Sequence, residues 1–272
     1  MSVDFDAQLV KVPSRSVLRF QSSPKGETYL AEQLLRFPYH ITRVHRATAC
    51  SQRADLCLQA LGGGLVEGDD IRLAVELGTG TRVKLTNQSA TKVHSMRGGR
   101  ASQKIKLDVN SGAWLEYMPK PLILFPGSDS HNTTRVRMAG NSGAVIVDSF
   151  YRFDPSGNGR PPLFFSNTVE VFDINDRLLV RDAMSVSSAD FIRPFAQRGL
   201  DCQCGIFLLG SAGEASSLKG LRYQTPHADL ACTQLPNKAG MCLRGFIAGP
   251  HALASVMSNV LALLKKSREI AT

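Results

Sequence analysis

The sequence has no apolar run long enough to cross a membrane as a helix. A membrane-spanning helix needs about 18 or more consecutive, mostly apolar residues, and no stretch of the 272 residues approaches this. Residues 1–11 alternate acidic side chains with isolated apolar ones, so they lack the continuous apolar core of a secretion signal. We therefore expect a cytoplasmic protein.

Cysteine is too scarce for a fold held together by disulfides. The six cysteines are sparse for 272 residues, and a reducing cytosol disfavours disulfide bonds. Cys202 and Cys204 are separated by one residue, which places both thiols on the same side of an extended segment. Two thiols alone bind a soft or borderline ion weakly. The pair is therefore a weak metal-ligand candidate, and buried free thiols are the alternative.

The motifs of nucleotide-binding proteins and of covalent catalysts are also missing. Gly62, Gly63 and Gly64 are not followed by the Gly-Lys-Ser/Thr ending of a phosphate-binding loop. The alternating apolar residues after them predict a strand, whereas a dinucleotide site needs a helix. There is no Gly-x-Ser-x-Gly elbow and no pair of histidines four residues apart. We expect no enzymatic activity, no dedicated metal site and no tightly bound cofactor.

Acidic residues are fewer than basic ones, which gives a formal net charge of +9 and a pI near 9.4. A basic protein attracts acidic proteins, anionic lipids and nucleic acids over a long range. The lysines and arginines are spread along the chain, so the charge alone selects none of these partners. A solvated surface, a protein docking face and a nucleic-acid-binding module all remain open at this point.

What the sequence does contain is an internal repeat. The segments around Gly80, Gly112 and Gly143, which are 32 and 31 residues apart, align by their apolar residues, and a fourth copy is centred on Asp176. The first three copies alternate apolar and polar residues on both sides of a turn that contains Gly or Asn, as paired strands with one buried face do. Units of this length stack, because a single unit cannot bury its own apolar face.

The repeat predicts an all-β fold built as a β-solenoid or β-superhelix, and ordinary hairpins in a sandwich are the alternative. We expect a single domain over residues 1–272, with the repeated strands at about 43–185. From Ala252 onward, apolar residues recur at helical spacing, which predicts an amphipathic helix at about 250–268. This helix packs either on the protein's own sheet or on a partner.

Three segments of the repeat region are rich in glycine or in short polar side chains. They are residues 62–69 (Gly-Gly-Gly-Leu-Val-Glu-Gly-Asp), 86–94 (Thr-Asn-Gln-Ser-Ala-Thr-Lys-Val-His) and 115–119 (Leu-Glu-Tyr-Met-Pro). In order and spacing these segments resemble the UreD (UreH) family of urease accessory proteins. The match runs from about Arg43 to Arg181 and is strongest between Gly62 and Phe125.

The resemblance implies an accessory protein of urease maturation that is not itself an enzyme. It implies an all-β superhelical fold and a complex with UreF and the GTPase UreG that docks on apo-urease. Nickel would be in transit through an interior channel of this chain, and GTP would be hydrolysed by UreG. A β-solenoid enzyme that acts on a polymer and a basic nucleic-acid-binding module are the alternatives.

The family pattern also implies roles for individual residues. The positions that it places along the nickel channel are Asp69, Thr86, Gln88, Ser89 and Glu116. The other motif positions, to which a structural role falls, are Gly62, Gly63, Gly64, Gly68, Ala90, Thr91, Lys92 and Pro119. Lys120 departs from the pattern and places a positive charge near the proposed cation route. Scattered carboxylates and hydroxyls suit transit, because a carrier must release its nickel.

Overall fold

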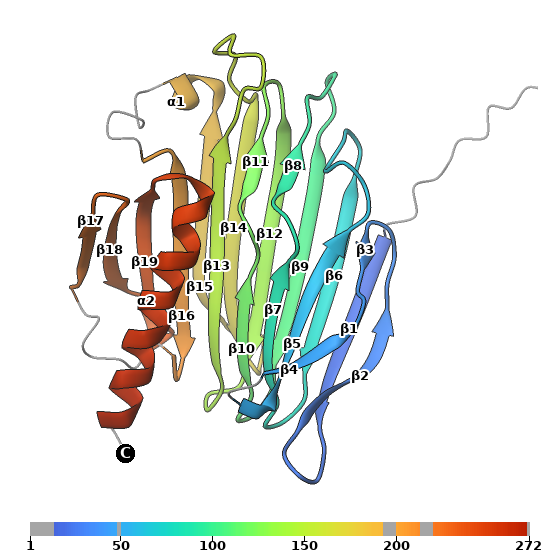
Figure 1. Cartoon of the computed structure of the whole chain (residues 1–272), viewed down its shortest axis with the longest axis vertical. Coiled ribbons are helices and arrows are strands. Elements are labelled where there is room, and N and C mark those ends of the chain that lie inside the picture. Colours follow the sequence, from blue (N-terminus) through green and yellow to red (C-terminus); the bar gives the residue numbers. More distant parts are fainter. Residues whose placement is uncertain (1–13, 48–49, 193–199, 213–219, 271–272) are drawn as a thin grey trace, which may run out of the picture.

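The computed structural model describes residues 14–47, 50–192, 200–212 and 220–270, and this part of the chain is built mainly of strands (Figure 1). The elements are β1 (Ser14–Ser22), β2 (Thr28–Leu34), β3 (Tyr39–His40), β4 (Val44–Ala47), β5 (Cys50–Ala60), β6 (Asp70–Leu77), β7 (Arg82–Asn87), β8 (Thr91–Val93), β9 (Ala101–Val109), β10 (Trp114–Met118), β11 (Leu122–Leu124), β12 (Asp129–Met138), β13 (Gly143–Arg152), β14 (Phe164–Asp173), β15 (Leu178–Ser187), α1 (Ser188–Ile192), β16 (Cys202–Gly210), β17 (Arg222–Thr225), β18 (Ala228–Gln234), η3 (Pro236–Lys238), β19 (Gly240–Ile247) and α2 (Gly249–Ile270).

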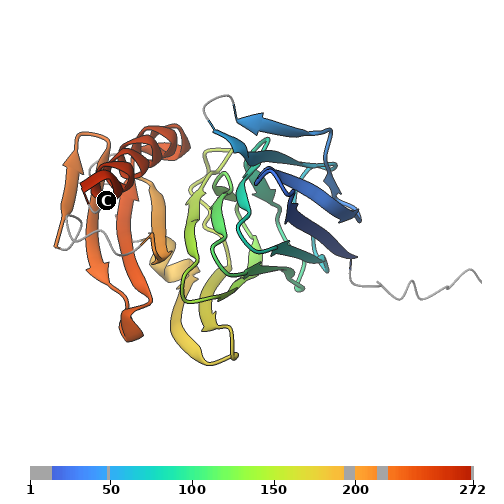
Figure 2. The same ribbon diagram turned by 90° about the horizontal axis from the view of Figure 1, so that it is seen from below.

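Two stacked sheets form a solenoid-like body. The seven-stranded sheet has the order β15-β14-β12-β9-β6-β1-β2, and the twelve-stranded sheet follows the path β17-β18-β19-β16-β13-β10-β7-β5-β3. The chain passes from one sheet to the other and back, so that β6, β9, β12 and β14 lie parallel in the first sheet and β7, β10 and β13 lie parallel in the second. This arrangement confirms the predicted all-β solenoid (Figure 2).

The spacing of the repeat differs from the prediction in its third copy. Val75 lies beside Leu107, and Leu107 beside Val136, so the structural spacings are 32 and 29 residues. The glycine-based alignment is right for the first two copies and two residues off in the third. Gly143 lies inside β13 rather than in the turn. A Cβ atom there would come within 2.6 Å of the Trp114 ring, so glycine meets a packing need at this position.

The predicted fourth copy centred on Asp176 is a hairpin rather than another turn of the solenoid. Asp176 lies between β14 and β15 with a φ of 60°, and β15 runs back antiparallel along β14 in the same sheet. The chain therefore does not cross to the other sheet here, and β15 forms one edge of the seven-stranded sheet.

The main apolar core lies between the two sheets. It is formed by the alternate residues that face inward, among them Leu73, Val75, Leu107, Leu115 and Ile146, each nearly or wholly inaccessible to solvent. Burying such side chains supplies the principal driving force for stacking the repeats.

The C-terminal part extends the larger sheet with antiparallel strands that the sequence did not predict. Strands β16, β19 and β18 continue from β13. Helix α2, at Gly249–Ile270, confirms the predicted terminal helix. Its residues Leu253, Val256, Met257 and Val260 pack in one buried cluster with side chains of these strands. The apolar face is thus covered by the protein's own sheet. In the described residues, no helix has both the length and the apolarity to span a membrane.

Candidate functional site

A polar layer crosses the interior between two apolar clusters. Gln103, Asn132 and Asn167 lie side by side on neighbouring strands of the seven-stranded sheet, and alternation points them to the same inner side as the core residues of those strands. Asn87 and Asp148 lie opposite, on β7 and β13, and border the same cavity. Because strands of successive repeats stack, this polar layer runs along the axis of the solenoid.

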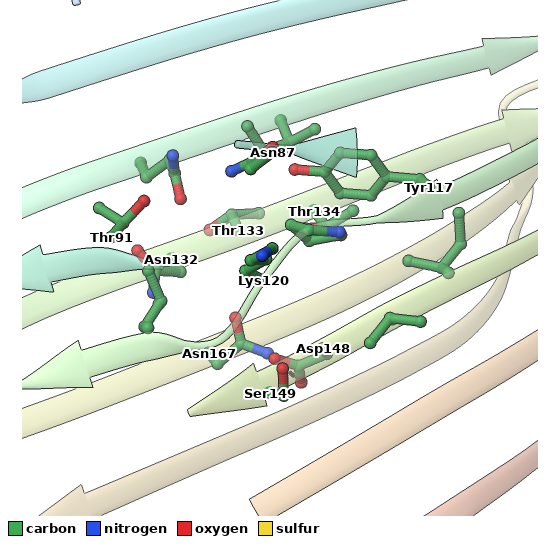
Figure 3. A pocket seen from close by; sticks show the side chains of 16 residues that line it. Asn87, Thr91, Tyr117, Lys120, Asn132, Thr133, Thr134, Asp148, Ser149 and Asn167 are labelled. Carbon is green, nitrogen blue, oxygen red and sulfur yellow. Dashed lines mark hydrogen bonds between the residues drawn. The ribbon is translucent and has the colours of Figure 1, made fainter. Parts of the chain in front are cut away.

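The layer lines a small, partly open cavity of about 50 Å³ (Figure 3). One water needs about 10–15 Å³ of such space, so the cavity has room for about three or four waters or for a partly hydrated ion. Both amide atoms of Asn132 and the hydroxyl of Ser149, which border the cavity, are buried and have no hydrogen-bonding partner in the described part of the chain. Buried polar groups of this kind normally have a partner, so these atoms point to a polar occupant.

Asp148 is the carboxylate of the cavity. Its Oδ2 accepts a hydrogen bond of 2.6 Å from Nδ2 of Asn167. Burial raises the pKa of Asp148 to about 6; the charge of Arg244 lowers it and that of Asp182 raises it further. Arg244 itself donates to Asp182 at 2.9 Å. Asp148 is half-buried and its carboxylate borders the cavity, so a cation in the cavity would stabilise its charged form.

The raised pKa of Asp148 has a consequence for stability. Since the folded protein holds this proton up to a higher pH than the unfolded chain does, the unfolding free energy falls as pH rises from about 4 to about 6. The ionised carboxylate then costs up to about 3 kcal/mol above pH 6, less where water in the cavity solvates it. Above pH 6, the Asp148→Asn variant should therefore be more stable than the wild type. Urea unfolding of both proteins at pH 4.5 and pH 7.5 measures the difference in unfolding free energy between them. A difference of the same size at the two pH values would contradict this prediction.

The cavity is lined in part by oxygen ligands of the kind that divalent cations accept. It offers one carboxylate and several neutral amide and hydroxyl oxygens, which are hard ligands without thiolate or imidazole. No group of three or more His, Cys, Asp or Glu side chains able to bind a metal ion occurs among the described residues.

The five channel candidates inferred from the sequence do not line this cavity. Thr86 and Glu116 alternate with the inward-facing core residues Leu85 and Leu115, so they lie on the outer face of the larger sheet. Glu116 is 8% exposed and accepts a 3.2 Å hydrogen bond from the Trp114 indole.

The other three candidates lie at the surface. Gln88 and Ser89 are exposed after β7, and Asp69 closes a turn by accepting from the backbone N–H of Val66 at 2.8 Å. Of the motif residues, Thr91 and Pro119 border the cavity, and so does Lys120. The channel role of the five candidates stays a prediction.

The glycine motif builds a tight loop. A Cβ atom on Gly64 would come within 2.3 Å of the Lys92 carbonyl oxygen, so the chain can pass there only as glycine. Gly63 accepts from His94 Nε2 at 2.9 Å, and the backbone N–H of Gly68 donates to Arg100 at 2.9 Å. Gly62 lies against Phe37. Ala90 is half-buried in the turn before β8.

The two weak thiol candidates lie in the cluster beneath helix α2. Cys202 and Cys204 are both fully buried there. Burial raises the pKa of Cys202 to about 12, with Asp201 and Asp148 adding to the effect, and it raises the pKa of Cys204 as well. Because metal binding needs the thiolate, this environment disfavours it.

The residues that sequence reasoning missed are Asn132, Asp148 and Asn167. A signal was present. Asp148 interrupts the apolar run Val145-Ile146-Val147 in a strand, and Asn132 occupies an inward position two residues before Thr134. A polar residue at the buried phase of a repeat is costly unless something satisfies it, so it indicates an interior polar site.

Fold and cavity together define a class of protein. It is a strand-built solenoid with a small polar cavity between its two sheets. Residues 14–271 match the family model described as UreD urease accessory protein. The chain belongs to the UreD family of urease accessory proteins. Membership implies an accessory, non-catalytic role in urease maturation.

Named relatives extend the same similarity over most of the chain. A urease accessory protein UreD 1 of Methylorubrum extorquens (strain PA1) is 31% identical over 244 residues, which are 87% of this chain and 82% of the relative. A UreD 1 of Pseudomonas syringae pv. tomato is 29% identical over 88% of this chain and 87% of the relative. A UreD of Haloquadratum walsbyi is 32% identical over 60% of this chain and 53% of the relative.

Proposed function

We propose that this chain docks on apo-urease with UreF and UreG in the cytoplasm, and that nickel passes through its interior on the way to the urease active site. The observation that supports the nickel route is the polar cavity between the sheets, which is lined by half-buried Asp148 and by the buried, unpartnered amide of Asn132. GTP hydrolysis belongs to UreG in this proposal. Nickel is cargo here and no resident cofactor is needed.

The ligand chemistry of the cavity supports transit. A single carboxylate among neutral oxygen donors attracts a divalent cation and yet binds it weakly enough for release. A cage of thiolates and imidazoles would retain the ion. The two apolar clusters on either side of the polar layer keep the route narrow. Lys120 borders the same cavity, and its positive charge repels a bound cation, which limits how much cation the cavity can hold.

Assembly and activation are tested together by co-expression. Urease subunits, UreF and UreG are produced with and without this chain, and urease activity and bound nickel are measured. We expect nickel-loaded, active urease only when this chain is present, and recovery of all partners on a tagged form of it. Equal activity without the chain, or a chain that recovers none of the partners, would contradict the proposal.

A further inference from the structure

Large apolar side chains gather at one end of the solenoid, where loops join the ends of β5, β8, β11 and β13 to the strands that follow (the upper end in Figure 1). We call this end the loop rim. Its exposed members are Phe37 (72%), Leu61 (53%), Val66 (49%), Phe153 (50%) and Leu163 (48%). Single exposed apolar residues are ordinary on a protein surface, whereas a group of them marks an interaction site.

Two of these side chains, Phe37 and Phe153, are linked across the rim by a chain of contacts through other residues. Phe37 lies against Gly62 at the start of the glycine motif. From Gly63 the contacts continue through His94, whose ring is 5.5 Å from the ring of Phe125, and from Phe125 to Phe153 at 6.2 Å. The result is a strip that runs from the loop before β3 to the loop after β13, with apolar rings at both ends and the hydrogen bond between His94 and Gly63 in the middle.

The rim is held in shape by its own hydrogen bonds. The carboxylate of Glu67 accepts from the backbone N–H groups of Arg97 and Gly99 at 2.6 and 2.9 Å, which ties the glycine motif to the next loop. Leu65 N–H donates to the Lys92 carbonyl at 2.8 Å. A surface fixed before binding loses little conformational entropy when a partner docks, and this favours affinity.

Basic groups flank this strip. A hollow of about 250 Å³ beside Phe153 is lined by Arg152 and Arg160. Nη1 of Arg152 donates to the Phe191 carbonyl at 2.7 Å, which fixes this guanidinium in place and leaves its charge without a carboxylate partner among the described residues. Arg97 is exposed on the neighbouring loop. Asp154 also borders the hollow and adds one negative charge, and its Oδ1 accepts from the backbone N–H of Ser156; two arginines against one carboxylate leave the lining basic. The rim thus offers positive charge next to an apolar surface.

We propose that the loop rim is a docking face for an acidic partner protein. An apolar side chain of the partner packs on the strip between Phe37 and Phe153, and a neighbouring carboxylate enters the hollow between Arg152 and Arg160. This assigns the glycine motif a function, since the motif positions the strip. The proposal rests on the proposed function only in the choice of binding partners for its test.

Binding of the full chain to purified apo-urease, UreF and UreG, each added singly, tests this face. Phe37→Ser removes the most exposed aromatic ring of the loop rim, and Ile174→Ser is its matched control, since Ile174 is 46% exposed in the turn at the opposite end. Arg160→Glu reverses a rim charge, and Lys25→Glu is its control in the β1–β2 turn. Circular dichroism confirms that each variant folds, as surface changes should allow.

We expect both rim variants to bind one of the three proteins about tenfold or more weakly, with both controls within about twofold of the wild type. Added salt should weaken the wild type and have less effect on Arg160→Glu. Wild-type binding that the rim variants retain would overturn the docking face alone. A wild-type chain that binds none of the three proteins would contradict both this inference and the proposed function.

Discussion

Leu107→Asp should abolish the folded state. Leu107 is fully buried between the sheets, with Val75 and Val136 beside it on the neighbouring strands. The substitution leaves a cavity and places a carboxylate where it has no partner, at a combined cost of about 5 kcal/mol or more. This is comparable to the whole stability of a typical domain. Loss of the β-sheet signal in circular dichroism and of a cooperative thermal transition is the expected result.

A change on the opposite side of the same strand controls for the introduced charge. Lys104 points outward, with its side chain 54% exposed and its ammonium 3.7 Å from Asp70. Lys104→Asp should leave the fold intact, because an exposed ion pair contributes about 0–1 kcal/mol. A folded Leu107→Asp with a transition near that of the wild type would show that the core between the sheets is wrongly placed.

The solenoid could be predicted because its signal is local. Apolar and polar residues alternate along each strand, and a glycine marks the turn at Gly80 and at Gly112, so a short window of the sequence shows both features. Both glycines have the positive φ that such turns need. The third copy was misaligned because Gly143 is glycine for another reason, the close approach of Trp114. Glycine can be required either by a positive φ in a turn or by the close approach of a neighbouring side chain, and the spacing of glycines in the sequence does not distinguish these two reasons.

Pairings between distant segments could not be predicted. Strand β1 lies parallel to β6, so the solenoid sheet begins at Ser14 rather than near residue 43. Strand β16 joins β13 after a gap of about 50 residues in sequence. Neither pairing leaves a local signal, since an isolated strand pattern fits many neighbours. The terminal helix could be predicted because its 3.6-residue period is local. Its packing with side chains of β16 and β19 agrees with the first of the two alternatives, packing on the protein's own sheet.

The candidate site was predicted less well than the fold. The family pattern drew attention to Thr86 and Glu116, whose polarity is evident in the motif, but phase in the strand decides which side faces the interior. Asn132 and Asp148 lie at the inward phase and outside the motifs. Alternate positions counted from the turn glycines identify the inward-facing residues of each strand, and Asn132 and Asp148 are polar residues at such positions.

If nickel passes through the interior, two different substitutions in the cavity should both reduce its delivery. Asp148→Asn removes its carboxylate, and Asn132→Leu replaces an unpartnered amide with an apolar side chain of similar size. Neither change should destabilise the protein, because the first removes a charge that burial makes costly and the second removes a buried amide that has no partner. Both should reduce nickel delivery, since the first removes the attracting charge and the second replaces polar ligands with hydrocarbon.

Control variants separate the cavity from the rest of the chain. Asp176→Asn also removes a carboxylate, from an exposed turn where a φ of 60° suits Asn as well as Asp, so it should change nothing. Ser89→Trp and Glu116→Gln test the candidates inferred from the sequence. Should these two lower nickel loading while the cavity variants do not, the route runs along the outer face of the larger sheet.

The most direct measurement is the nickel content per urease active site, taken beside the yield of the complex with UreF, UreG and urease for each variant. Passage through the interior predicts that Asp148→Asn and Asn132→Leu assemble at wild-type yield and deliver much less nickel, while Asp176→Asn matches the wild type in both. Nickel content that stays at the wild-type level in both cavity variants, or that falls only in proportion to complex yield, would contradict it.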